Sequence, residues 1–73
     1  MSKSNSYELI SKKLAERIKR RRKQLGMTQE DMIDHGFNYR AYQRLESGKQ
    51  NPTLQTLVRV SIALKISISK LFE

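Results

Sequence analysis

The amino-acid sequence predicts a small all-α fold, a compact bundle of five helices in one domain over residues 1–73. The 73 residues are about half of a typical domain length, so a catalytic and a regulatory domain do not both fit. Three glycines and one proline leave long uninterrupted stretches, and apolar residues recur at helical spacings. With no cysteine and one histidine, disulfides and thiolate metal sites are excluded, and zinc or haem lacks ligands.

A long first helix is expected between Asn5 and Gly26, after a flexible arm over residues 1–6. Asn5 and Glu8 have the spacing of an N-terminal capping arrangement, and Gly26 is typical of a helix end. Arg22 interrupts the apolar stripe of this helix, which is an unusual place for a charge. The stripe consists of Tyr7, Ile10, Leu14, Ile18 and Leu25.

Four shorter helices follow, each with a residue that can cap its N-terminus. The second ends near Gly36 and directs Met32 and Ile33 inward, and Phe37 can act as a hydrophobic staple for the third. The capping residues are Thr28, Asn38, Thr53 and Ser67. The fourth helix is expected to contribute Leu54, Leu57, Val60, Ile62, Ala63 and Leu64 to the core, and the fifth Ile68, Leu71 and Phe72.

The charge of the chain is strongly positive and unevenly spread. The formal net charge is +8 and the pI is about 10.2. Residues 1–25 carry a net charge of +7, residues 26–37 carry −3, and residues 38–73 carry +4. Such a field attracts a polyanion, either nucleic acid or an anionic membrane surface.

The stretch from Thr28 to Gly48 reads as a helix, a tight turn and a second helix. Four polar residues of the second helix have i, i+1, i+4, i+5 spacing and share one face, while Tyr42 and Leu45 can pack inward. Arginine can bond guanine bidentately and glutamine can bond adenine, so this face suits reading of the major groove. The four candidate base-reading residues are Tyr39, Arg40, Gln43 and Arg44.

Three segments give the sequence a specific resemblance when they are taken together. They are RIKRRRKQLGMTQEDM, GFNYRAYQRLESGKQNPTLQTL and ALKISISKLF. In these segments, within residues 14–72, the chain resembles the Cro/phage-repressor-like (XRE) helix-turn-helix family. The resemblance implies a five-helix repressor-like bundle whose second and third helices form the helix-turn-helix. It also implies sequence-specific binding to double-stranded DNA, usually as a two-fold dimer that controls transcription.

The resemblance also implies roles for residues outside the reading face. Arg22 and Glu46 match positions that form a structural ion pair in relatives, which explains the charge on the apolar stripe. Gln29 is expected to bind phosphate and to brace the third helix. The other expected phosphate-binding residues are Asn38, Lys49, Gln50, Asn51 and Arg21.

The second helix departs from the family pattern. The segment before Gly36 has one residue fewer than usual, so the helix is shorter or its turn is rebuilt, and Ile33 stands where relatives commonly carry alanine. Because extra volume does not fit a tight helix crossing, we expect the second helix to be rotated or more distant. Tyr42 replaces a usual aliphatic residue, and its hydroxyl needs a partner when buried.

The sequence therefore predicts a DNA-binding transcriptional regulator that acts on an operator, is not an enzyme, and needs no cofactor or metal. A homodimer is expected, and candidate contact residues are Leu64, Ile66, Ile68 and Phe72. The alternative is a protein-interaction module, such as an antitoxin or adaptor, on the same fold. A basic amphipathic membrane-surface helix over 7–25 is disfavoured, because its apolar stripe is narrow and needed for the core. We expect no membrane partner, no small-molecule effector domain, and a cytoplasmic location, since no signal peptide or apolar run of about 20 residues is visible.

Overall fold

The computed structural model describes the backbone of residues 4–49 and 51–73. Every regular element in these ranges is helical, which confirms the predicted all-α class. The elements are α1 (Ser4–Gln24), the 3-10 helix η1 (Glu30–His35), α2 (Tyr39–Ser47), α3 (Leu54–Ala63) and α4 (Ile68–Leu71). None of the helices within these ranges has both the length and the apolar character needed to cross a bilayer.

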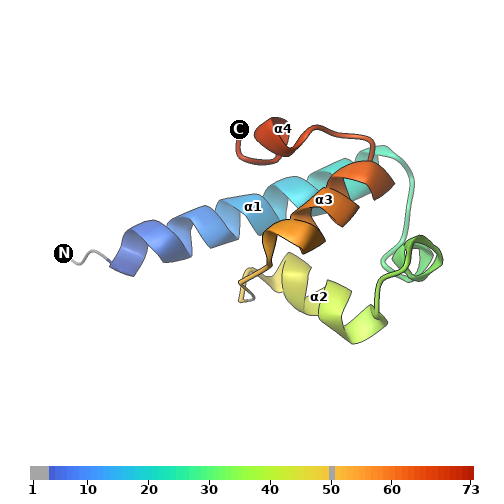
Figure 1. Ribbon diagram of the computed structural model, residues 1–73, viewed down its shortest axis with the longest axis horizontal. Coiled ribbons are helices and arrows are strands. Elements are labelled where there is room, and N and C mark those ends of the chain that lie inside the picture. The colour runs from blue at the N-terminus through green and yellow to red at the C-terminus, as the bar shows by residue number, and fades with distance from the viewer. Residues whose placement is uncertain (1–3, 50) are drawn as a thin grey trace.

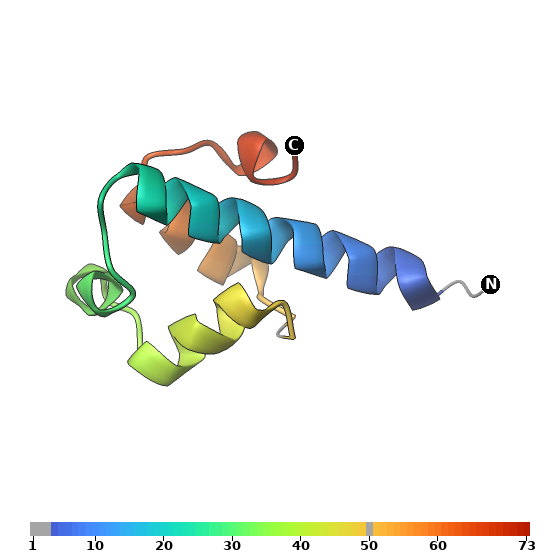
Figure 2. The same cartoon turned by 180° about the vertical axis from the view of Figure 1, so that it is seen from behind.

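The long helix α1 is the axis of the molecule, and its N-terminal half projects beyond the other helices (Figures 1 and 2). In both views α2 and α4 lie on opposite sides of α1. This projection gives the chain its elongated outline of 41 × 23 × 21 Å. The arm predicted over residues 1–6 is wrong for residues 4–6, which belong to α1, while residues 1–3 lie outside the described residues. The predicted Asn5 cap also falls on a side chain that is not described.

Only the central part of the predicted α1 stripe belongs to the core. Leu14 and Ile18 are buried, whereas Tyr7 and Ile10 are exposed on the half of α1 that projects beyond the other helices, and Leu25 is exposed in the turn after α1. The side chains that are almost fully buried come from every helix. They are Ile18, Met32, Tyr42, Val60, Leu64 and Leu71.

Several residues expected in the core face outward instead. Ile33 was predicted to point into the crossing between η1 and α2, but it is 49% exposed and faces outward. Leu54 and Ile62 are also exposed, because the buried face of α3 is occupied by Leu57, Val60 and Ala63. Phe72 is half exposed at the end of α4.

The predicted caps of α2, α3 and α4 are confirmed. The side chains of Asn38, Thr53 and Ser67 each accept a hydrogen bond from the backbone N–H three residues later. Phe37 is buried before the cap of α2 and stacks edge-on against Tyr42, with ring centroids 5.5 Å apart. This contact is the predicted hydrophobic staple, and it fixes the angle at which the chain enters α2.

The second helix accommodates its smaller number of residues by a change of helix type. Residues 30–35 form a 3-10 helix, which rises about 2.0 Å per residue where an α-helix rises about 1.5 Å. Six residues therefore span roughly the distance that eight would span in an α-helix. Thr28 and Asp31 cap its start reciprocally, each side chain accepting from the other's backbone N–H at 3.1 and 2.7 Å. Gly36, at φ 89°, ends it in a left-handed conformation that favours glycine.

Candidate nucleic-acid interface

The outer face of α2 carries the four side chains predicted to read bases. Tyr39, Arg40, Gln43 and Arg44 are all exposed, so their polar groups reach solvent. Tyr42 and Leu45, on the opposite face, are 1% and 4% exposed and anchor the helix to the core. The helix is thus divided into an apolar back and a polar front.

A buried ion pair attaches α2 to α1. Arg22 Nε donates to Glu46 Oε2 at 2.6 Å, and Arg22 Nη2 donates to Glu46 Oε1 at 3.0 Å. Arg22 Nη1 also donates to the Met27 carbonyl at 2.7 Å. The two side chains are 7% and 3% exposed, so the pair is shielded from water. Two parallel hydrogen bonds give this contact a fixed geometry, which sets the position of α2 against α1. The ion pair that the resemblance implied is therefore present.

The surroundings of the ion pair shift the pKa values of Arg22, Glu46 and the neighbouring Tyr42. Burial disfavours the charge of Glu46, but the hydrogen bonds from Arg22 and Gln29 help to outweigh burial, and the pKa of Glu46 is lowered. The hydrogen bond with Glu46 raises the pKa of Arg22. Burial is the main cause that raises the pKa of Tyr42 above its usual value. Although the Tyr42 hydroxyl lies near the ion pair, it makes no hydrogen bond of acceptable geometry among the described residues.

Gln29 joins the ion pair to the reading face. Its Nε2 donates to Glu46 Oε1 at 3.0 Å, and its Oε1 accepts from Gln43 Nε2 at 3.4 Å. Gln29 therefore contacts the third predicted helix of the chain, α2, to which both partners belong. The side chain is half-buried at the start of η1.

The other predicted phosphate-binding residues flank α2. Asn38 is exposed at the start of α2, and its Oδ1 accepts from the Ala41 N–H at 3.1 Å. Lys49 and Asn51 are exposed in the turn that follows α2. Gln50 lies outside the described residues.

Arg21 is placed elsewhere. Its Nε and Nη2 donate to the carbonyls of Leu64 and Lys65, at 2.9 and 3.1 Å, and its Nη1 donates to Gln24 Oε1 at 3.4 Å. The Leu64 and Lys65 carbonyls belong to the α3–α4 turn, which lies on the side of α1 opposite α2 (Figure 1). The structure thus assigns Arg21 to the turn and does not bring it together with the other phosphate-binding candidates.

The sequence analysis did not predict that basic residues of α1 make structural hydrogen bonds. Arg17 and Arg21 lie one helical turn apart, and Arg17 Nε donates to the Lys70 carbonyl at 3.1 Å. Both arginines therefore satisfy carbonyls at the ends of α3 and α4. Their shared face was visible in the sequence, but nothing in it showed that this face meets helix ends.

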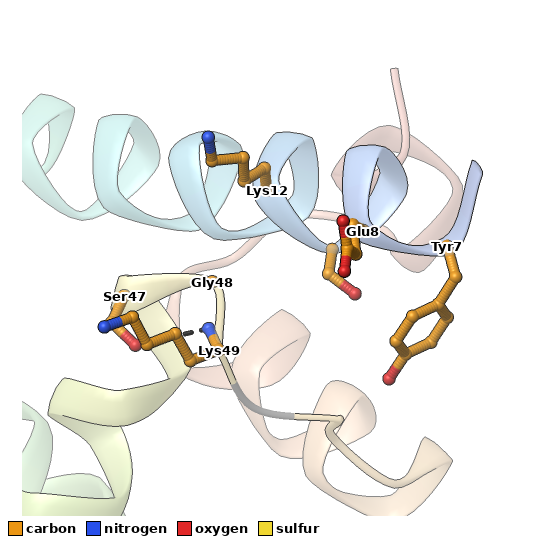
Figure 3. A pocket seen from close by; sticks show the side chains of 7 residues that line it. Tyr7, Glu8, Lys12, Ser47, Gly48 and Lys49 are labelled. Atoms are coloured by element: carbon orange, nitrogen blue, oxygen red, sulfur yellow. Dashed lines mark hydrogen bonds between the residues drawn. The ribbon is translucent and has the colours of Figure 1, made fainter. Parts of the chain in front are cut away.

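A hollow between α1 and the turn after α2 was also missed (Figure 3). Gly48 passes so close to α1 that an added Cβ would lie 3.5 Å from Lys12 Cα. The Lys49 N–H donates to Ser47 Oγ at 3.3 Å, whereas the ammonium of Lys12 points away from Lys49 (Figure 3). The hollow is lined by Tyr7, Glu8, Ser11, Lys12, Ser47, Gly48 and Lys49. No group of three His, Asp or Glu residues among the described residues is arranged to hold a metal ion.

Comparison with known proteins identifies the class. Residues 18–71 match the model of a helix-turn-helix family, so the chain belongs to the XRE-type helix-turn-helix family. Over 60 residues the chain is 40% identical to the cryptic phage CTXphi transcriptional repressor RstR of Vibrio cholerae serotype O1. The alignment covers 81% of this chain and 54% of the relative, so the chain spans about half the length of that protein. No solved structure matches the chain.

Proposed function

We propose that this protein is a transcriptional regulator that binds specific sequences of double-stranded DNA with α2 in the major groove. The observation that carries the proposal is the exposed polar front of α2, held in place from behind by the Arg22–Glu46 pair. An α-helix fits the major groove, and arginine and glutamine side chains match the patterns of guanine and adenine there. Membership of the helix-turn-helix family and the similarity to a phage transcriptional repressor support the same role.

Phosphate contacts complete the proposed interface. Gln29 and Asn38 lie at the starts of η1 and α2, and Lys49 and Asn51 lie in the turn after α2. These residues surround the reading face, where contacts to the DNA backbone fix register and orientation while base contacts supply specificity. The net charge of +8 adds long-range attraction to the duplex.

A two-fold dimer is part of the proposal, with one α2 in each of two successive major grooves. Its half-sites would be about 34–36 Å apart on one face of the duplex. Two of the four contact residues predicted from the sequence belong to the core, since Leu64 is fully buried and Ile66 packs against it. Phe72 of the same set is exposed. Sedimentation of the protein with and without a two-site duplex tests the stoichiometry, and one protein per duplex would contradict it.

Selection from a pool of random duplexes, followed by sequencing, tests the proposal directly. We expect enrichment of one sequence with inverted half-sites and tighter binding to it than to a shuffled control. Equally tight binding to all duplexes would contradict the proposal, because it would show that the protein binds DNA as a non-specific polycation. Salt dependence of the affinity separates the two components, because phosphate contacts weaken with salt and base contacts do not.

A protein-interaction module on the same fold is the second candidate function. The observation that favours it is an apolar stripe on the outer face of α3, where Leu54, Val58 and Ile62 are exposed at four-residue spacing. Changing these three residues to polar ones separates the candidates. If the protein is a regulator, the triple variant still binds an isolated duplex with the selected half-site more tightly than other duplexes. If the protein is an adaptor that does not read DNA, neither the wild type nor the variant shows this preference.

A further inference from the structure

The N-terminal half of α1 projects beyond the other helices and carries apolar side chains on its surface (Figures 1 and 2). No side chain among residues 6–13 is buried. Tyr7 and Ile10 continue the line of the core residue Leu14 at helical spacing, and each of the two is 54% exposed. Most helical stability in proteins comes from the packing of an apolar face. The line formed by Tyr7 and Ile10 is therefore a helix face that lacks a partner within this chain.

The charges of the projecting half leave this line free. Glu8 and Lys12 are four residues apart and share a different face of α1. Lys13 flanks the line. In an antiparallel pair centred midway between Tyr7 and Ile10, however, the two copies of Lys13 would be about 14 Å apart along the helices, which exceeds the screening length in ordinary salt. Two such faces can therefore meet without placing like charges against each other, so the face is complementary to a second copy of itself.

We propose that two copies of this chain pair through the projecting halves of α1, which run antiparallel with Tyr7 of each copy against Ile10 of the other. This inference rests on the DNA-binding function proposed above and supplies the interface of its two-fold dimer. The two-fold axis would cross α1 at right angles, so that α2 lies on the same side of α1 in both copies. Both reading faces then meet one face of a duplex.

Contacts between α2 and α1 show where the reading face lies along α1. At the end of α2, Gly48 passes beside α1, where an added Cβ would lie 3.5 Å from Lys12 Cα and 3.6 Å from Ala15 Cβ. At the start of α2, Tyr39 lines a hollow together with Arg22. α2 therefore runs beside residues 12–22 of α1 in the opposite direction. The base-reading candidates belong to the first two-thirds of α2, which places them at the level of about residue 20 of α1.

This level sets the distance between the two reading faces of a pair. The point midway between Tyr7 and Ile10 is about 11–12 residues away, which is about 17 Å at the rise of an α-helix. A two-fold axis doubles this distance, so the two reading faces would be about 34 Å apart along α1. Half-sites in successive major grooves on one face of a duplex are about 34–36 Å apart. The projecting half of α1 therefore has the length that a dimer needs to span one turn of DNA.

The pairing is expected to be weak without DNA. Two faces with so few apolar side chains bury less than the roughly 1,000 Å² that a stable interface needs. A duplex with two half-sites holds two copies close together and raises their effective concentration. The interface should therefore show itself mainly as tighter binding to two half-sites than to one.

The first test compares Ile10→Asp with the control Leu9→Asp. Leu9 is 57% exposed, much like Ile10, but it lies on another face of α1, so both variants add the same charge at similarly exposed positions outside the core. The probes are duplexes with one or two selected half-sites. The wild-type protein and Leu9→Asp should bind two half-sites about tenfold or more tightly than one. Ile10→Asp should lose most of this gain and still prefer the single half-site to a shuffled duplex. A full gain in Ile10→Asp would overturn the proposal and place the dimer contact on another surface, such as the outer face of α3.

The second test needs no DNA. The chain contains no cysteine, so introduced cysteines report their own contacts. A mixture of Tyr7→Cys and Ile10→Cys proteins at high concentration should form disulfide-linked dimers of the two variants faster than Leu9→Cys forms dimers, because only facing residues have their Cβ atoms close enough. Equal rates would overturn the proposal, since they report random collision.

The two tests separate this interface from the proposed function. If the cysteines link as expected but the wild-type protein binds all duplexes equally, the pairing stands, whereas the DNA-binding function and the spacing of half-sites fail. If the wild-type protein prefers the selected half-site but the cysteines link no faster than the control, the DNA-binding function stands and this interface is wrong.

Discussion

Arg22 and Arg40 carry the same guanidinium group in opposite surroundings. Arg22 is 6% exposed and directs its donors to Glu46 and the Met27 carbonyl, so it serves the contact between α1 and α2. Arg40 is exposed on the front of α2, where its donors face solvent. Positive charge alone therefore does not assign an arginine to DNA. The buried face of the motif sets where α2 lies, and the exposed face decides what it can contact.

Removing the buried carboxylate should have the largest effect. Glu46→Ala leaves Arg22 buried without its partner and should cost about 3–5 kcal/mol in the free energy of unfolding. Urea denaturation followed by circular dichroism measures this loss. The double variant Arg22→Met with Glu46→Leu is the control, and it should lose much less because no charge remains buried. Equal losses in the two variants would show that the ion pair contributes through shape rather than charge.

The same pair predicts an acid limit to stability. Because the folded-state pKa of Glu46 is lowered, its contribution is complete above the ordinary value of 4.5 and is lost as pH falls through the lower folded pKa. Tm should therefore fall on acidification below about pH 4.5. The Arg22→Met, Glu46→Leu variant should show a smaller fall over the same range. A fall of the same size in both proteins would assign the acid limit to other carboxylates.

The exposed arginine should affect recognition without affecting folding. Arg40→Ala should reduce discrimination against a changed base pair by about 1–3 kcal/mol and leave the unfolding free energy within about 0.5 kcal/mol. Lys49→Ala is the matched control for charge, and it should weaken selected and shuffled duplexes alike. Fluorescence anisotropy with both duplexes measures the two ratios. If the two variants lose affinity in the same pattern, Arg40 contacts phosphate and not bases.

The smallest effect is expected at Tyr42, between the two regions. Its hydroxyl is buried without a well-formed hydrogen bond among the described residues, so Tyr42→Phe should leave stability unchanged or raise it by up to about 1 kcal/mol. Because burial raises the pKa of Tyr42, the wild-type protein should also lose stability as pH rises past the usual value of 10.0, and the variant should lose less. A loss above about 1 kcal/mol at neutral pH would show that the hydroxyl is bonded to the ion pair.

Much of this arrangement could be predicted from the sequence because local rules decide it. Asn38, Thr53 and Ser67 cap helices by short-range hydrogen bonds, and the period of the third helix places Arg40 opposite Leu45. The Arg22–Glu46 pair came from family resemblance, since 24 residues separate its members and no local pattern connects them.

The predictions that failed concern which residues meet other helices in the folded chain. Tyr7 and Ile10 fit the α1 stripe but have no partner helix beside them, and Ile33 faces outward on a 3-10 helix whose turn differs from that of an α-helix. Arg21 was grouped with DNA-facing cations, yet it bonds carbonyls more than 40 residues away in sequence. These outcomes depend on tertiary contacts, which periodicity does not encode.

Methylation interference at guanine N7 is a direct test of base reading by Arg40, because this atom lies in the major groove. On the selected duplex, we expect at least one guanine whose methylation blocks the wild-type protein but not Arg40→Ala. That result would place the exposed arginine of α2 against a base edge. An interference pattern that is identical for both proteins, or absent at every guanine, would contradict major-groove reading by Arg40.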